Sequence, residues 1–216
     1  MKGTPIMSLH LIIGDKLLSS WSLRAALAVE LTGAPYSEEL IKLGKPDTRA
    51  LLLKHSPTAK VPLLQTARGT IADSLAIAEY LAEQFPSEQL WPSDIFARAQ
   101  ARSACAQMHS GFFAMRNHMP FNLNHDAPLN PVPPEVKVDI ERMLALWAEC
   151  RAAATESGPY LFGRVSLADA FFAPIAVRLR TYQVTLPAAD EAYVETVYQW
   201  PAFKAWQKAG LEELNP

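Results

Sequence analysis

Three serines and a tryptophan cluster at Ser19, Ser20, Trp21 and Ser22, between a short apolar run at residues 9–13 and a helical pattern that follows. A helix N-terminus stabilises negative charge, and a hydroxyl placed there can donate a hydrogen bond to an anion or a thiolate. Serine is also a favoured N-cap, because its oxygen accepts a hydrogen bond from a first-turn amide. Local evidence favours the cap, but a single cap accounts for only one of the serines.

A second polar pair, Asp73 and Ser74, stands at the start of another helical pattern, in which Ile77, Leu81 and Phe85 recur every four residues. The same two interpretations apply here. The pair is either a plain N-cap or a set of polar groups that bind a ligand beside the positive end of the helix.

Basic side chains recur further along the chain. Arg98, Arg102, His109 and Arg116 are separated by four, seven and seven residues, a spacing that predicts one line along a single helix. Such a line is either a basic wall for an acidic ligand or a face that meets solvent or a dimer partner. Charged stripes usually face water, so the second interpretation is favoured.

The composition excludes several classes of function. The 216 residues are 50% hydrophobic and 19% charged, which is ordinary for a soluble, well-packed protein. The net charge of −2 leaves no basic excess to neutralise the phosphates of nucleic acid. No apolar run approaches the ~20 residues that span a bilayer, so no membrane span is predicted. Residues 1–5 lack the features of a signal peptide and are expected to form a short tail.

The two cysteines, Cys105 and Cys150, lie far apart, each within a helical pattern. They predict neither a disulfide framework nor a metal cluster. The five histidines are scattered and form no pair with metal-ligand spacing. The sequence therefore predicts a cytoplasmic protein without a metal.

The elements that must position these residues differ between the two halves of the chain. In the first half, strands are predicted over residues 9–13, 36–43, 61–64 and 70–72, and helices over 21–32, 46–54 and 73–85. The order is β-α-β-α-β-β-α, an α/β unit small enough to be one domain.

The second half carries no comparable strand signal. Helices are predicted from the spacing of apolar and small residues over 97–108 and 136–150, with a proline-rich loop at 120–134 between them. Ser166 and Asp169 have the spacing of a capping box, and they start a further helix. A last short helix is predicted after residue 201.

These patterns divide the chain into two domains. We predict an α/β domain over residues 7–86, a linker over 87–93 and an all-helical domain over 94–216.

Three motifs resemble the cytosolic glutathione transferases. Residues 19–24, Ser-Ser-Trp-Ser-Leu-Arg, resemble the Ser-Ser-Cys-Ser-Trp-Arg corner of the zeta class, the maleylacetoacetate isomerases. Residues 60–64, Lys-Val-Pro-Leu-Leu, and residues 73–81, which begin Asp-Ser, are similar to two further signatures of that family. The resemblance covers nearly the whole chain. It implies a bacterial type of the enzyme with a thioredoxin-like N-terminal domain and an all-α C-terminal domain.

The resemblance also implies what each motif does with glutathione. Alignment on Arg24 makes Ser19 the catalytic serine, with Ser20 a close second, because a donated hydrogen bond favours the thiolate. Ser22 is expected to cap the helix or to face inward. The residues expected to bind glutathione are Trp21, Lys60, Val61, a cis Pro62, Asp73 and Ser74.

Roles within that group follow from its chemistry. Val61 offers a strand edge to the cysteine backbone of glutathione. Asp73 can pair with the γ-glutamyl amine, and Ser74 can bond the γ-glutamyl carboxylate at the helix start. Lys42, Lys45 and Lys60 are candidate partners for the glycyl carboxylate, and Lys60, which precedes Val61, is preferred. For Arg24, a structural ion pair or an exposed position on the helix is favoured over contact with a ligand.

The resemblance implies a homodimer in which glutathione, as co-substrate, attacks a small electrophile, in conjugation or in glutathione-dependent isomerisation. His109 and Phe113 are expected to line the electrophile pocket. Trp21 stands where the zeta pattern has cysteine, which weakens a specific assignment as a maleylacetoacetate isomerase. The alternative is a non-catalytic glutathione-binding or scaffold protein of the same fold. A thiol–disulfide reductase is disfavoured, since the corner has no cysteine.

Overall fold

A computed structural model describes residues 9–214 of the chain. The tail predicted at residues 1–5 lies outside the described residues. Residue 7, where the predicted α/β domain begins, and residue 216, where the predicted helical domain ends, also lie outside the described residues.

A four-stranded sheet forms the centre of the first half. Its strands are β1 (Leu9–Ile13), β2 (Tyr36–Leu40), β3 (Leu63–Thr66) and β4 (Gly69–Ala72), in the order β2-β1-β3-β4. β1 runs parallel to β2, and β3 is antiparallel to both β1 and β4. The sequence order β-α-β-α-β-β-α is the one predicted.

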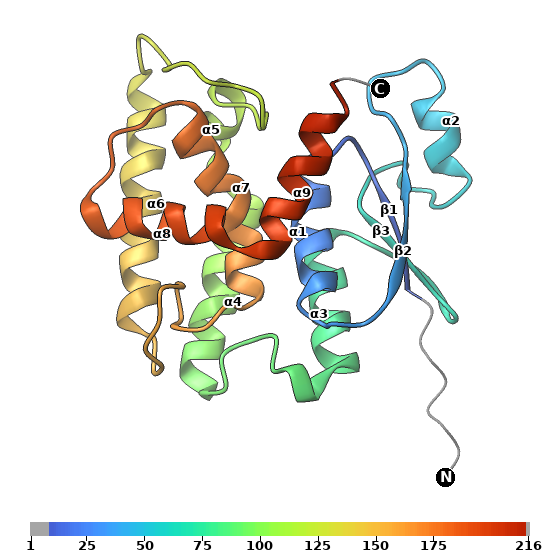
Figure 1. The fold of residues 1–216 in the computed structure, drawn as a ribbon, viewed down its shortest axis with the longest axis horizontal. Helices are drawn as coiled ribbons and strands as arrows, with labels where there is room; N and C mark the ends of the chain where they lie inside the picture. The colour runs from blue at the N-terminus through green and yellow to red at the C-terminus, as the bar shows by residue number, and fades with distance from the viewer. Residues whose placement is uncertain (1–8, 215–216) are drawn as a thin grey trace.

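Helices cover both faces of this sheet (Figure 1). Side chains alternate between the faces of a strand, so Leu11 and Ile13 of β1 join the main core with α1 (Ser20–Glu30) and α3 (Ser74–Gln84). Ile12 points to the opposite face, where it packs with Leu52 of α2 (Thr48–Leu53) and Leu63 of β3. This layering fixes the loops at one end of the sheet, from which the candidate site is built.

In the described part of the second half the regular elements are helices, joined by loops of which one carries two isolated β-bridges. After a 3₁₀ turn, η1 (Pro86–Glu88), come α4 (Ile95–Ser110), α5 (Phe113–His118), α6 (Pro134–Ala152), α7 (Leu167–Thr181), α8 (Ala188–Gln199) and α9 (Pro201–Glu212). α7 is the central helix of this half: it is buried along almost its whole length and packs against α1, α4 and α8. α9 lies between the two halves, beside α1 (Figure 1).

The predicted capping box at the start of α7 is confirmed. Asp169 is completely buried, and its Oδ2 accepts hydrogen bonds from the backbone N–H and the hydroxyl of Ser166, at 2.8 and 3.1 Å. Its Oδ1 accepts from the Leu161 N–H and the Tyr193 hydroxyl, both at 3.2 Å. Burial raises the pKa of this carboxyl to about 6, against the effect of these four donors. The Asp169 carboxylate thus connects the N-terminus of α7 with the loop at Leu161 and with Tyr193 of α8.

The prediction of one basic line along a single helix is wrong. α4 ends at Ser110, Gly111 follows in an extended conformation, and Phe112 has a left-handed φ of 58°, so Arg116 belongs to the separate helix α5. The sequence signal for this break is weak, because a lone glycine is tolerated inside many helical patterns.

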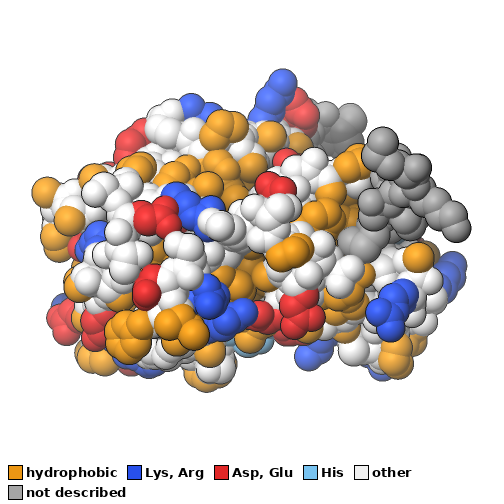
Figure 2. Space-filling model, turned by 90° about the horizontal axis from the view of Figure 1, so that it is seen from below, with side chains coloured by type: hydrophobic (Ala, Val, Ile, Leu, Met, Phe, Trp, Pro, Cys, Tyr) orange, Lys and Arg blue, Asp and Glu red, His pale blue; other side chains and the backbone are white. Residues whose placement is uncertain are grey.

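No helix within residues 9–214 is long and apolar enough to cross a membrane. The same residues contain no group of three or more His, Cys, Asp or Glu side chains that could hold a metal ion. The face shown in Figure 2 carries acidic and basic side chains interspersed with hydrophobic ones, in keeping with the small net charge.

Candidate active site

Ser19 is the N-cap of α1. Its side-chain oxygen accepts a hydrogen bond from the Ser22 backbone N–H at 3.2 Å, and its hydroxyl donates to Ser22 Oγ at 2.8 Å. Ser22 Oγ also accepts from the Gly14 N–H at 3.0 Å. Of the two expectations for Ser22, the inward-facing one is therefore observed, and the capping role belongs to Ser19.

Ser20 and Trp21 follow in the first turn of α1. Ser20 is nearly buried, and its hydroxyl makes no hydrogen bond to any residue that the structure describes. The Trp21 ring lies 4.3 Å from the guanidinium carbon of Arg24 and 5.3 Å from that of Arg116. His109 meets the same ring edge-on at 5.0 Å. Trp21 therefore lies against three basic side chains, and the faces of its ring can interact favourably with the two guanidinium groups.

Val61 and Pro62 precede β3, and the peptide bond between them is cis, as the resemblance implies. The backbone N–H and C=O of Val61 make no hydrogen bond within residues 9–214. An unpaired backbone edge of this kind can pair with an extended peptide ligand.

Asp73 and Ser74 open α3. Asp73 is the N-cap: its Oδ1 accepts from the N–H groups of Leu75 and Ala76, at 2.7 and 3.4 Å. Its backbone has a φ of 79°, which is uncommon outside glycine. The Ser74 side chain is fully buried, and its hydroxyl has no hydrogen-bond partner among the described residues. Because buried hydroxyls are normally paired, this one is available to a ligand.

All predicted catalytic and glutathione-binding residues line one cavity of about 950 Å³. The cavity lies between the loops at the end of the sheet and the helical half. The predicted residues that line it are Ser19, Ser20, Trp21, Lys60, Val61, Pro62, Asp73 and Ser74. The helical half contributes Arg116, Pro120, Phe121 and Arg178.

Two of these lining residues, Arg116 and Arg178, are largely buried. In each guanidinium group only some of the nitrogens donate a hydrogen bond within the described residues. Arg116 donates through Nε to the Gly111 carbonyl at 2.9 Å, and through Nη2 to the Met108 carbonyl. Arg178 donates through Nε to the Met119 carbonyl at 2.9 Å, and through Nη1 to a carbonyl of its own helix. No carboxylate in the described chain forms a salt bridge with either.

Arg24 lies behind these two arginines and is fully buried. The expectation of an ion pair or an exposed position is wrong: Arg24 donates to Met108 Sδ at 3.2 Å, and its Nε and Nη1 have no partner among the described residues. Burial lowers the pKa of Arg24 well below its usual value, and the nearby charges of Arg116 and Arg178 lower it further. The pKa of Arg178 is lowered to about 9 for the same two reasons, burial first and Arg116 second. This end of the cavity therefore has an excess of positive charge that favours an anion.

The two residues predicted for the electrophile pocket lie outside the cavity lining. His109 stands behind Trp21, with its Nε2 3.3 Å from Asp73 Oδ2, and burial lowers its pKa. Phe113 is 67% exposed and lines a separate surface hollow with Val138. Arg98 and Arg102 are elsewhere too: Arg98 donates to backbone carbonyls, and Arg102 pairs with Glu79.

Models of the glutathione S-transferase N-terminal and C-terminal domains match residues 18–84 and 99–209 respectively. The chain belongs to the glutathione S-transferase family. The predicted fold class and the predicted enzyme, with glutathione as co-substrate, are confirmed by this membership.

Individual relatives of this glutathione S-transferase are of more than one kind. Glutathione S-transferase 1 of Dianthus caryophyllus is 31% identical over 164 residues, 73% of this chain and 72% of that one. Maleylpyruvate isomerase of a Ralstonia species is 28% identical over 185 residues, 79% of this chain and 85% of that one. The crystal structure of a glutathione transferase homologue from Burkholderia with bound glutathione superposes with a TM-score of 0.71 at 24% identity, over 95% and 98% of the two chains.

Sequence reasoning missed Arg178 in this transferase. It lies in α7, a helix that is buried along almost its whole length and whose pattern predicts core packing. The available signal was the charge itself, because an arginine in a continuously buried helix needs a functional or structural partner.

Proposed function

We propose that glutathione occupies the part of the cavity formed by residues 60–74, with its cysteine backbone paired to Val61. Its γ-glutamyl amine would meet Asp73, and its γ-glutamyl carboxylate would meet Ser74 at the N-terminus of α3. The observation that carries this placement is that Ser74 lines the cavity and that its buried hydroxyl has no partner among the described residues.

The thiol of glutathione then lies at the start of α1. Free thiols have a pKa near 8.5, so a hydrogen-bond donor at this helix end is needed to favour the thiolate at neutral pH. Ser19 supplies that donor by releasing its present acceptor, Ser22 Oγ. A thiolate is the stronger acceptor, because hydrogen bonds to charged groups are roughly twice as strong as neutral ones. Ser20, whose hydroxyl is uncommitted in the described structure, is the second donor at the corner.

The second substrate in this proposal is a small electrophile that carries a carboxylate. Arg116 and Arg178 line the same cavity as the serine corner, and neither forms a salt bridge with a carboxylate among the described residues. An arginine fork bonds a carboxylate in bidentate fashion, which would fix the electrophile with its reactive carbon toward the thiolate.

Such a site suits glutathione-dependent cis–trans isomerisation as well as conjugation. In isomerisation the thiolate adds to one carbon of a C=C bond, and the electron pair moves onto the adjacent carbonyl group. Rotation about the resulting single bond is followed by return of the pair and departure of the thiolate. The similarity of this chain to the Ralstonia protein named maleylpyruvate isomerase supports the proposal of isomerisation.

The test is a calorimetric titration of glutathione into the protein, with thiolate absorbance followed against pH. The proposal expects binding and a bound thiol that ionises well below pH 8.5. Absence of binding would contradict it and favour the non-catalytic alternative of a scaffold with the same fold.

Ser74→Ala separates binding from stability. We expect the KM for glutathione to rise about 10-fold, because a hydrogen bond to a charged group contributes ~1.5–3 kcal/mol. Stability should not fall, since the hydroxyl that is removed has no partner among the described residues. Steady-state kinetics and thermal melting test this. A lower melting temperature with an unchanged KM would assign Ser74 a structural role.

Arg178→Gln tests the anionic electrophile. We expect the KM for a small unsaturated dicarboxylic acid to rise about 10- to 100-fold, as one charged hydrogen-bond partner is lost. The rate with an uncharged aryl halide should change little. Arg178→Lys is the matched control, because it restores the charge but not the fork. Equal losses with both electrophiles would show that Arg178 only supports the fold.

A homodimer in the cytoplasm completes the proposal. Ile95 and Phe96, at the start of α4, are 75% and 65% exposed, and a second copy of the chain would cover such apolar surface. Both cysteines are free and buried, which suits a reducing compartment. Sedimentation equilibrium on the wild type tests the dimer.

A further inference from the structure

The loop that delivers the serine corner is held by residues from the other end of the chain. We define the corner loop as residues 14–18, between β1 and α1. Within it the Asp15 carbonyl accepts from the N–H groups of Leu18 and Ser19, at 3.2 and 2.8 Å. Any displacement of the loop backbone is therefore passed directly to Ser19.

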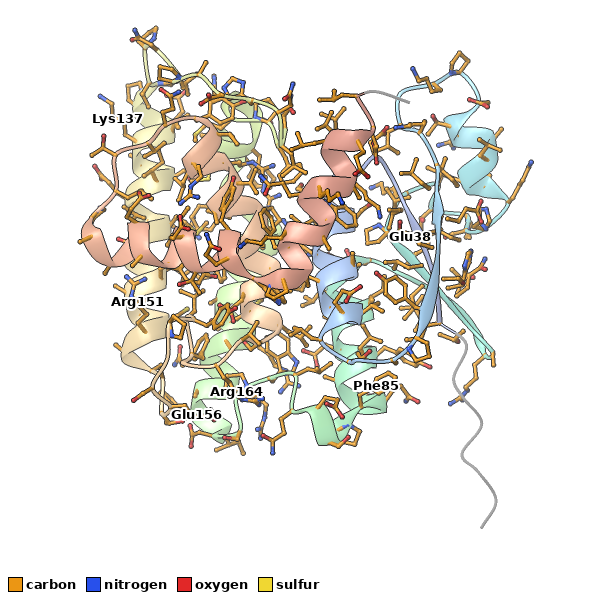
Figure 3. The ribbon with its side chains drawn as sticks, in the orientation of Figure 1. Glu38, Phe85, Lys137, Arg151, Glu156 and Arg164 are labelled. Carbon is orange, nitrogen blue, oxygen red and sulfur yellow. The ribbon has the colours of Figure 1, made fainter. Side chains whose placement is uncertain are left out.

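α9 contacts the corner loop through both backbone groups of Lys16. The Trp206 indole N–H donates to the Lys16 carbonyl at 3.1 Å, and the Lys16 N–H donates to Glu213 Oε1 at 2.9 Å. The Lys16 ammonium also lies 5.1 Å from the Trp206 ring centroid and pairs with Glu38 of β2, on the side of that strand nearest α9 (Figure 3). The loop is thus fixed at one residue from two positions of the helix region.

Gly210 shows how closely α9 approaches this loop. A Cβ atom there would lie 3.2 Å from both the Lys16 carbonyl carbon and the Leu17 nitrogen, and 2.9 Å from Leu123 Cδ1. These contacts are tighter than ordinary van der Waals separation, so any side chain at residue 210 must push the helix and the loop apart.

Glu213 is the most connected residue in this contact. While Oε1 accepts from the loop, Oε2 lies 2.9 Å from the Lys42 ammonium, which is also 3.1 Å from Asp15 Oδ1. Asp15 Oδ2 in turn accepts from the Leu43 N–H at 2.7 Å. Only 12% of the Glu213 side chain is exposed, although it stands just beyond the last turn of α9. It therefore connects α9, the corner loop and the loop after β2.

We infer that Glu213 is a positioning residue for catalysis, which acts with α9 to hold the thiolate-stabilising serine in place. This inference rests on the proposed function, because it assigns Glu213 to the geometry of the Ser19 hydroxyl and of the start of α1. A shift of about 1 Å in a reacting group can cost about 100-fold in rate, so such support is worth building into the fold.

The loss of the Glu213 charge and the loss of its positioning role should shift the pKa of the bound thiol in opposite directions. The direction of the measured shift therefore tests the inference. Glu213 is an anion, so removing it should favour a nearby thiolate and lower the pKa of the bound thiol. Loss of positioning should weaken the hydrogen bond to the thiolate and raise that pKa.

The experiment compares Glu213→Ala, Glu213→Gln and Gly210→Ala with wild type. For Glu213→Ala we expect a bound-thiol pKa about half a unit higher or more, and a kcat about 10-fold lower, with the KM for glutathione within about 3-fold. Glu213→Gln keeps an oxygen for the Lys16 N–H and should restore most of the loss. Gly210→Ala improves helix propensity by ~1 kcal/mol, yet it should raise the thiol pKa as Glu213→Ala does.

The matched control is Glu212→Ala, which removes an exposed neighbour whose ion pair with Lys208 spans 4.0 Å. It should leave both the thiol pKa and kcat unchanged. Suppose that wild type lowers the pKa of the bound thiol, and that Glu213→Ala and Gly210→Ala both leave this pKa unchanged or lower it further. That result would overturn the inference and leave the proposed function intact. A wild type that does not lower the thiol pKa would overturn the proposed function and this inference with it.

Discussion

Ser19→Ala is expected to raise the pKa of the enzyme-bound thiol toward its free value near 8.5 and to reduce kcat by about 100- to 1,000-fold, the typical loss on removing one donor to a developing or stabilised anion. Ser19 stands at the N-terminus of α1, where its hydroxyl can exchange the neutral Ser22 oxygen for the thiolate. The same substitution removes a helix cap, which costs about 1 kcal/mol of stability. Thiolate absorbance against pH and single-turnover rates measure the first two effects, and denaturant unfolding measures the third.

Ser20→Ala is the control that the corner itself provides. It removes a hydroxyl from the next residue without touching the cap, so its stability should match wild type and its rate loss should be smaller. If Ser20→Ala raised the thiol pKa while Ser19→Ala lowered only stability, the donor would be Ser20 and Ser19 would be a cap alone.

Asp169→Ala is expected to lower the free energy of unfolding by at least about 3 kcal/mol. It leaves four donors, from Leu161, Ser166 and Tyr193, without their buried acceptor, and each unsatisfied group costs ~1–3 kcal/mol. For a chain of this length, a loss of 3 kcal/mol corresponds to a fall in melting temperature of roughly 6–12 °C. Urea unfolding at neutral pH is the direct measurement.

Asp94→Ala gives the comparison for a cap of the ordinary kind. Asp94 starts α4 and accepts only from the N–H groups of Phe96 and Ala97, at 3.0 and 2.8 Å. Its loss should cost about 1 kcal/mol. Equal effects of the two substitutions would mean that Asp169 serves only as a helix cap and does not tie α7 to its neighbours.

Most strands and long helices could be predicted from the sequence because their apolar residues form a short continuous run or keep a helical period. The strand at residues 9–13 and the helix at 136–150 are clear cases, observed as Leu9–Ile13 and Pro134–Ala152. α5 and α8 were not predicted. α5 has only six residues. In α8 the buried residues keep helical spacing, but one of them is Asp190, so the apolar stripe is limited to Tyr193, Val194 and Val197.

The glutathione side of the candidate site could be predicted because local motifs carry it. Ser19, Val61 and Ser74 each stand at the end of a strand or the start of a helix, within a few residues of a recognisable signature. The electrophile side has no such signature. Arg178 reaches the cavity from α7, and Arg116 reaches it only because α4 ends at Ser110, so their meeting depends on tertiary packing that no spacing along the chain encodes.

The cavity lining is also divided along the chain, and this division bears on how the enzyme can acquire new substrates. One group of lining residues comes from residues 18–74, and the other comes from Arg116, Pro120, Phe121 and Arg178. Under the proposed function, substitutions at those four positions would alter which electrophile is accepted, while the residues proposed to hold the co-substrate stay unchanged. A small combinatorial library restricted to the four positions is therefore an economical route to altered selectivity, and natural divergence within the family has the same opportunity.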